Sequence, residues 1–320
     1  MRLARNLTRV LPAIALAASS CAPSSLSPSS SRLRIVSPDL SRPIVETIPG
    51  PAEPQDPVRQ AVFARINEDR IAAGLATVAW DEDAARVADA FTKAQVREKT
   101  RGHFLTDGLP PYARTALAGV FGMGAENAIS WVTTADAFRE PAVTLALEGH
   151  EQMIAEKPPD DGHRRTILDP DATHVGVGWA MAGGRFQLAQ EFLTRRLERL
   201  QLEGREGAVV RISGRAIPGW SIQFATAAWE PRLRMTREQA TSRSSYSFPS
   251  PEIAMVPEGA NSTVAISGAP AHDRLRIYST RDFGLLFAAE RPGLWTIVFY
   301  FSSATSLGST PGACVVLEVE

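Results

Sequence analysis

His163 stands in a stretch of sequence that presents an imidazole to its surroundings. It follows the helix-breaking pair Pro158-Pro159, lies in the polar run 162–165, and precedes the Val-Gly alternation of residues 175–178. Two earlier pieces, Gly102-His103 and the run 124–129 with Glu126, fit beside it. Imidazoles and carboxylates that converge on a cleft bind a divalent metal through nitrogen, with the acids orienting the rings or ligating directly. The same groups can instead form a closed hydrogen-bond network without an ion.

Other catalytic arrangements fail on the sequence. A zinc-protease helix needs a second histidine four residues after the first, and the residue four positions after His150 is Ile154. The chain has no Gly-x-Ser-x-Gly elbow, and neither cysteine lies beside a candidate base. We therefore expect His150 to lie on a helix surface and His174 to be a turn residue near the rim of the cleft.

Taken in order, these pieces resemble the CAP superfamily (cysteine-rich secretory, antigen 5, pathogenesis-related 1) in its bacterial branch. Residues 66–70 and 74–75 upstream and residues 190–192 downstream add to the resemblance, which covers roughly residues 58 to 193. It implies an α/β/α sandwich for this region. The family places many functions on one scaffold, among which lipid, sterol and ion binding are common and an enzymatic activity is rare.

The resemblance singles out four side chains for a ligand cleft. His103 matches the family's first cleft histidine, Glu126 the acid of its Gly-Glu-Asn motif, and His163 the histidine of its Gly-His motif. Glu156 is the expected fourth, and Glu151, about one and a half helical turns earlier, competes with it. His103 and His163 would hold any metal, a divalent cation such as zinc, and no catalytic residue is assigned.

Helical and strand patterns surround these residues and predict an α+β chain. Asp56-Pro57 begins a helix that runs to Gly74, Trp80-Asp81 opens a second helix, and a third lies between residues 136 and 156. Residues 175–192 predict a hairpin that turns at 183–184, in which the glycines at 176 and 178 allow close packing. We assign residues 57–195 to the CAP domain.

The first 21 residues predict a signal peptide that ends in a lipobox. Arginines at positions 2, 5 and 9 precede an apolar run, and small residues lead to Cys21, the expected site of lipidation. Cleavage by an ordinary signal peptidase, with Cys21 lost in the leader, is the alternative. Residues 22–56 are rich in Ser and Pro and predict a disordered tether. The expected location is extracytoplasmic, on a bacterial membrane, with the outer membrane or cell surface favoured because Ala22 is not Asp.

Residues 205–320 predict a second, β-sandwich-like domain. Short β-rich runs alternate there with Gly, Pro and Asp turns, and nothing in them indicates chemistry. Cys314 sits in an alternating apolar run, which favours a buried, inert thiol. The polar stretch 194–207 predicts a boundary between two independently folded units.

These observations predict a membrane-tethered CAP-domain lipoprotein that binds a small or lipidic ligand and performs no reaction. A net charge of −1 excludes an electrostatic attraction to nucleic acid. The alternative is a metal-dependent hydrolase or protease, in which Glu126 or Glu156 acts as general base on a metal-polarised water.

Overall fold

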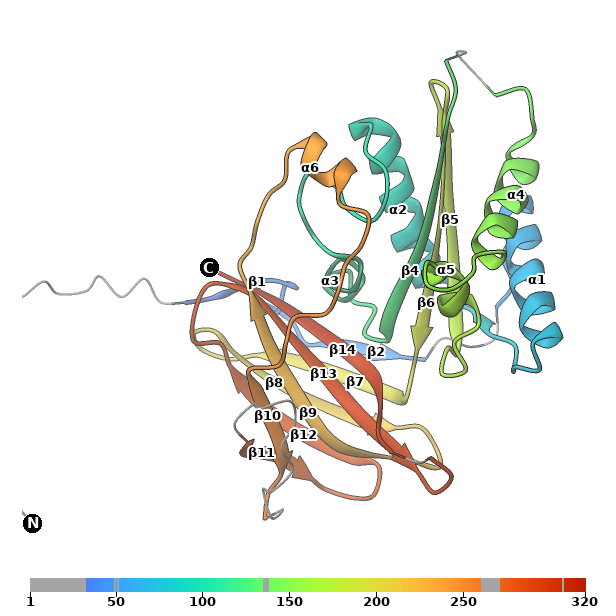
Figure 1. Ribbon diagram of the computed structural model, residues 1–320. Coiled ribbons are helices and arrows are strands. Elements are labelled where there is room, and N and C mark those ends of the chain that lie inside the picture. The colour runs from blue at the N-terminus through green and yellow to red at the C-terminus, as the bar shows by residue number, and fades with distance from the viewer. Residues whose placement is uncertain (1–32, 49, 51, 135–137, 260–270, 307) are drawn as a thin grey trace, which may run out of the picture. The chain divides into compact units, whose positions relative to one another are not determined.

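A computed structural model describes residues 33–48, 50, 52–134, 138–259, 271–306 and 308–320 (Figure 1). The described residues all belong to one compact unit. None of the helices among them is long and apolar enough to cross a membrane. The predicted signal peptide, Cys21 and the first part of the tether lie outside the described residues.

A four-stranded sheet forms the centre of the first half of the chain. Its order is β3-β5-β6-β4, with β3 (Ala79–Trp80), β5 (His174–Ala182), β6 (Arg185–Thr194) and β4 (Met123–Val132). Strands β5 and β6 form the predicted hairpin, and β4 pairs antiparallel with β6 along its whole length. The sequence did not predict β4 as a strand. It is an edge strand, and it carries Glu126 and Asn127.

Helices cover both faces of this sheet, as the sequence predicted. Helix α2 (Glu82–Glu98) lies on one face, while α1 (Pro57–Ala72) and α4 (Ala142–Ile154) pack together on the other (Figure 1). The side chain of Asp56 caps α1 by accepting hydrogen bonds from the first turn, and Asp81 caps α2 in the same way. Two short helices, α3 (Pro111–Leu117) and α5 (Gly162–Ile167), complete this part of the fold.

Two glycines of β5 set the distance between the sheet and α2. A Cβ atom on Gly176 would lie 2.1 Å from the backbone nitrogen of Ala85, and one on Gly178 would lie 2.2 Å from that of Asp89. These contacts leave no room for a side chain, so the prediction that these glycines allow close packing is confirmed.

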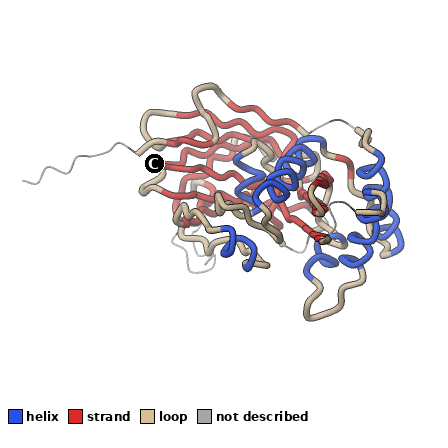
Figure 2. Tube along the Cα trace, turned by 90° about the horizontal axis from the view of Figure 1, so that it is seen from above, coloured by secondary structure: helices blue, strands red, loops and turns tan. Residues whose placement is uncertain are grey.

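Eight strands from the second half of the chain and two from residues 35–47 form a ten-stranded sheet in the described part of the chain, so the predicted β-rich region is present. The sheet order is β1-β14-β13-β9-β10-β11-β12-β8-β7-β2. The strands are β1 (Ile35–Ser37), β2 (Ile44–Thr47), β7 (Leu197–Gly204), β8 (Val209–Ala216), β9 (Trp220–Glu230), β10 (Ile253–Pro257), β11 (Ala271–Ile277), β12 (Asp282–Ala288), β13 (Gly293–Ser303) and β14 (Thr310–Val319). Strands from both ends of the sheet contribute residues to one hydrophobic core, which includes the buried thiol of Cys314. Figure 2 shows these strands side by side, in red.

The structure corrects the prediction that residues 22–56 form a disordered tether. Within that range, β1 pairs antiparallel with β14 and β2 with β7, so both lie at edges of the large sheet. The backbones of Arg34 and Glu320 exchange hydrogen bonds of 2.9 and 3.0 Å. The Ser- and Pro-rich composition indicated disorder. The short β-branched runs nevertheless form strands, because partner strands that are distant in the sequence stabilise them.

The predicted boundary at 194–207 is also wrong, because it contains β7. Leu197, Leu200 and Leu202 of this strand are buried, while the charged residues between them face outward. The core of the large sheet also includes Tyr112 and Phe121 from the first half of the chain. The two halves therefore share a core and do not form two independent units.

Candidate functional site

The four predicted site residues come together at the free edge of β4. His103 lies in the turn after α2, Glu126 on β4, Glu156 just after α4, and His163 in α5. The Nδ1 atom of His103 is 2.8 Å from Oε1 of Glu126, and Nδ1 of His163 is 2.5 Å from Oε1 of Glu156. The two imidazole centroids are 6.2 Å apart, at an interplanar angle of 37°. We refer to these four residues as the histidine site.

Backbone contacts fix His163 in this position. Its own amide donates to Oε2 of Glu156 at 2.9 Å, so Glu156 holds both the ring and the main chain of His163. The side-chain amide of Asn127, on β4, donates to the carbonyl oxygen of His163 at 3.1 Å. Asn127 thus ties α5 to the sheet, the backbone-fixing role that the sequence favoured over a part in a reaction. Glu151, the competing acid, is an exposed residue of α4.

Two further charged residues reach the site, and neither was predicted from the sequence. Arg114 of α3 forms an ion pair with Glu126 and lies over the ring of Phe91, 3.7 Å from its centroid. Glu191 of β6 is opposite Glu126 in the sheet, and its Oε1 is 3.8 Å from Nη2 of Arg114. The sequence indicated their role only weakly. Glu191 belongs to the run 190–192 of the family resemblance, but no motif marks it as a site residue.

The charges of this buried group do not balance if every acid is ionised. One guanidinium faces two carboxylates. Burial raises the pKa of Glu126, although the positive charge of Arg114 opposes this shift. Burial and the neighbouring Glu126 raise the pKa of Glu191 well above its ordinary value. Burial and the charge of Arg114 lower the pKa of His103 to about 4, so its imidazole is neutral at pH 7. Of the two acids, Glu191 is therefore the one whose protonated form the fold favours more, while Glu126 forms the ion pair with Arg114.

A tyrosine from the second half of the chain also contacts the site. The hydroxyl of Tyr246 accepts a hydrogen bond from the backbone amide of Glu126 at 2.7 Å. Its ring meets that of His103 edge to face, with centroids 4.9 Å apart. No local pattern around Tyr246 indicates this role, because the contact joins residues that are 120 positions apart in the sequence.

His150 and His174 lie outside the site. His150 was predicted to lie on a helix surface, and the structure corrects this: its side chain is fully buried. Its Nε2 is 2.9 Å from Oδ2 of Asp69, and its Nδ1 accepts from the side-chain amide of Gln190 at 3.0 Å. The helix face that carries His150 packs inward, and these two partners satisfy the ring. His174 is the first residue of β5, and its Nδ1 is 2.8 Å from Oγ1 of Thr173.

The donor set of the histidine site fits a divalent cation only in part. Among the described residues, no group of three or more His, Cys, Asp or Glu side chains is arranged to hold a metal ion. Each site imidazole, however, has its Nδ1 bound to a carboxylate, which leaves Nε2 for another partner. Metal–nitrogen bonds of about 2.0–2.1 Å would place the ring centroids roughly 5–6 Å apart, close to the present separation. Two histidines would thus be the protein ligands, with water completing the coordination.

A small cavity of about 200 Å³ is lined by chain neighbours of the site residues, among them Ala125 beside Glu126, but by none of the four site residues themselves. Ala125 and Phe192 of the four-stranded sheet, Thr166 of α5, and Phe248 and Pro311 from the second half of the chain are among its lining residues. Most of this lining is apolar, with Asp169 and Asp171 also contributing. The cavity therefore fits a small apolar group rather than a large polar ligand.

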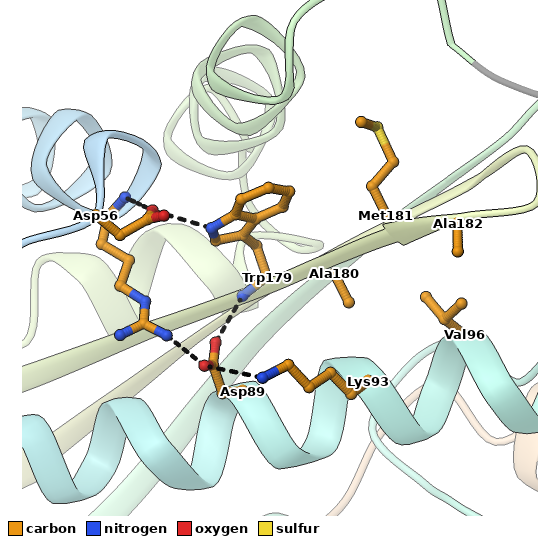
Figure 3. Close-up of a pocket in the computed structure, with 9 residues that line it drawn as sticks. Asp56, Asp89, Lys93, Val96, Trp179, Ala180, Met181 and Ala182 are labelled. Carbon is orange, nitrogen blue, oxygen red and sulfur yellow. Dashed lines mark hydrogen bonds and ion pairs between the residues drawn. The ribbon is translucent and has the colours of Figure 1, made fainter.

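A second hollow, of about 440 Å³, is separate from the histidine site (Figure 3). Trp179 and Met181 of β5 line it together with Asp56, Arg59 and Asp89. Its polar groups are already paired, because Asp89 binds both Arg59 and Lys93, while Asp56 accepts from the indole of Trp179. None of its lining residues belongs to the histidine site or is next to one of its members in the chain, and we assign it no function.

Comparison with known proteins agrees with this fold. Residues 63–194 match the model of the cysteine-rich secretory protein family, CAP. This part of the chain, which contains the four-stranded sheet and all four residues of the histidine site, therefore resembles a CAP domain. The matched segment ends at the last residue of β6, before the remaining strands of the ten-stranded sheet. No curated protein matches the chain in sequence.

Several solved structures also resemble part of the chain. An outer surface protein from Borrelia burgdorferi is 15% identical, with a TM-score of 0.36, over 44% of this chain and 96% of that one. An extracellular protein containing an SCP domain from Bacillus anthracis is 21% identical, with a TM-score of 0.31, over 45% of each chain. Venom allergen-like protein 4 from Schistosoma mansoni is 12% identical, with a TM-score of 0.31, over 43% of this chain and 88% of that one.

Proposed function

We propose that this chain is an extracytoplasmic binding protein whose CAP domain takes a small or lipidic ligand at the histidine site and catalyses no reaction. The observation that carries this proposal is the orientation of the two imidazoles. A carboxylate holds each ring through Nδ1, so both Nε2 atoms remain available to a ligand. The adjoining apolar cavity would accept a small apolar part of that ligand.

The surroundings of the imidazoles support binding rather than nucleophilic catalysis. Among the described residues, the side-chain hydrogen bonds of His103 and His163 go to Glu126 and Glu156, and no Ser, Thr or Cys partner appears. A serine or cysteine nucleophile needs a base within hydrogen-bond reach. A divalent cation such as zinc is an optional part of the proposed site, and His103 and His163 would be its protein ligands.

The experiment is a calorimetric titration with zinc chloride of the wild type and of a His103→Ala/His163→Ala double variant. We expect measurable binding by the wild type that the double variant loses, because each histidine supplies one of the two protein nitrogens. A His150→Ala variant is the matched control, since this buried ring is already paired with Asp69 and Gln190. Equal binding by the wild type and the double variant would reject the metal site.

A metal-dependent hydrolase is the second candidate, and the buried acid pair favours it. Catalytic acids often have raised pKa values, as Glu126 and Glu191 do here. In such an enzyme Glu126 or Glu156 would act as general base on a metal-polarised water. Turnover of peptide and ester libraries, measured with and without a chelator, separates the two candidates. Chelator-sensitive turnover that the His103→Ala/His163→Ala variant lacks would establish the hydrolase and reject the binding-only proposal.

We further propose that acyl chains on Cys21 hold the protein at a bacterial membrane, with the outer membrane or cell surface favoured. The positively charged start, the apolar run and the small residues before Cys21 support this. Mass spectrometry of the mature N-terminus tests it. An acylated Cys21 is expected, and a mature chain that starts elsewhere or carries no acyl group would reject the anchor.

A further inference from the structure

The connection between β9 and β10 crosses from the large sheet to the histidine site. We call residues 231–252 the strap. It contains a short helix, α6 (Arg237–Ser242), whose start is fixed by a capping box between Thr236 and Gln239. The CAP-family match ends at residue 194, so the strap comes from outside the matched segment.

The first part of the strap is held against the loop that follows His103. The guanidinium of Arg232 donates to the carbonyl oxygen of Asp107, and the amide of Met235 donates to that of Thr106 at 3.0 Å. Gly108 makes this approach possible, because a Cβ atom there would lie 2.1 Å from the carbonyl oxygen of Leu233. These contacts fix the strap over the loop before it reaches the site.

The later part of the strap lies against aromatic rings of the CAP domain. The guanidinium of Arg243 lies over the ring of Phe104, 4.4 Å from its centroid. Phe248 stacks on Tyr112 with centroids 4.2 Å apart, and it also lines the cavity beside the site. Tyr246 lies between these two anchors and contacts His103 and Glu126.

The strap covers the two histidines unequally. The side chain of His103, beneath Tyr246, is 10% exposed, whereas that of His163 is 31% exposed. The Tyr246 hydroxyl also satisfies the backbone amide of Glu126 on the edge strand β4. An unpaired amide at a sheet edge attracts other chains, so the phenol both covers the ring and closes this edge.

We infer that Tyr246 is a specificity-determining residue of the histidine site. It shields His103 and directs any ligand to approach from the side of His163, the more exposed of the two histidines. The role of the site as a binding site rests on the proposed function, but the shielding of His103 can be measured without a ligand. Ligands too large to reach the imidazoles past Tyr246 would be excluded.

Chemical modification of the histidines tests this inference. Diethyl pyrocarbonate acylates accessible neutral imidazoles, and peptide mass spectrometry gives the rate at each histidine. In the wild type at pH 7 we expect His163 to react faster than His103. The Tyr246→Ala variant should raise the His103 rate by about tenfold or more, because modification no longer requires local opening of the strap. Tyr246→Phe keeps the ring and should stay near the wild-type rate.

His150 serves as the internal control for folding, because it is fully buried away from the strap. An unchanged His103 rate in Tyr246→Ala, with His150 still protected, would overturn the inference, as would equal His103 and His163 rates in the wild type. If Tyr246→Ala exposes His150, the Arg243→Ala variant replaces it as the test, because it loosens the strap from Phe104. An unchanged His103 rate in Arg243→Ala would then overturn the inference.

Zinc titration of the same variants keeps this result separate from the proposed function. A faster His103 reaction in a protein that binds no zinc would uphold the shielding and reject the metal part of the site. Zinc binding by a protein in which His103 is not shielded would uphold the metal part of the site and reject the shielding.

Discussion

At the scale of single residues, the charge balance around Arg114 governs the histidine site. Two buried acids share one cation, so the fold favours the protonated form of one of them. Glu191 is that acid, and its raised pKa has a direct thermodynamic consequence. The unfolded chain ionises Glu191 at its ordinary pKa, whereas the folded chain ionises it only at a higher pH. Stability from this group is therefore full below the unfolded pKa and is lost as pH rises toward the folded pKa.

Glu191→Gln should stabilise the protein at pH 7, because glutamine has the shape of the protonated acid and cannot ionise. We expect a gain in the free energy of unfolding on the order of 1 kcal/mol. Urea denaturation at pH 7 and at pH 4.5 measures it, and the difference between the two proteins should shrink at the lower pH. The exposed Glu151→Gln is the control and should change stability by less than about 0.5 kcal/mol. A variant less stable than the wild type at pH 7 would show that Glu191 is ionised there.

At the scale of elements, the sequence predicted those helix starts and turns that depend on neighbouring residues. Asp56-Pro57 and Asp81 mark helix starts because capping depends on neighbouring residues, and the β5–β6 hairpin follows from alternation around a Gly-Gly turn. Strand β4 escaped prediction because its polar Glu126 and Asn127 are buried by partners far away in the sequence.

The same distinction explains the site. The resemblance placed His103, Glu126, Glu156 and His163, because sequence motifs surround them. Arg114, Glu191 and Tyr246 have no such motifs, and only tertiary packing brings them to the site. The strap in particular depends on the docking of a distant segment, for which a local pattern gives no signal.

The packing of α2 against β5 allows a sharp prediction. Gly176→Ala places a methyl group 2.1 Å from a backbone atom of α2, so the helix must move away from the sheet. We expect a loss of roughly 3 kcal/mol in the free energy of unfolding, the upper range for overpacking. Gly308→Ala is the control, since a Cβ atom there meets nothing within 4 Å. If chemical denaturation finds Gly176→Ala as stable as this control, the glycine does not set the helix–sheet distance.

At the scale of the whole molecule, Arg195 joins the two sheets. Its side chain is buried and pairs with Glu46 of β2 at 2.5 Å and with Asp81, the cap of α2, at 2.8 Å. Arg195 itself lies between β6 and β7, at the point where the chain passes from one sheet to the other. The shared core around Tyr112 and Phe121 reinforces this junction.

The described unit should therefore unfold in a single cooperative transition. Arg195→Ala should lower the free energy of unfolding by roughly 3–5 kcal/mol, because it leaves two buried carboxylates without their cation. Calorimetry should find the whole transition shifted to lower temperature, while Arg205→Ala, which breaks an exposed pair with Glu203, should leave it nearly unchanged. Two separate transitions in either protein would show that the halves fold independently.

The pairing of β1 with β14 makes the fold a candidate for circular permutation. The backbones of Arg34 and Glu320 already exchange hydrogen bonds, so a short Gly-Ser linker would join these residues without strain. New ends opened at the turn between Gly183 and Gly184 would fall on the loop of the β5–β6 hairpin. In such a rearranged chain the two strands of that hairpin would become the first and last elements, and its sheet would have to form by joining the two ends of the polypeptide.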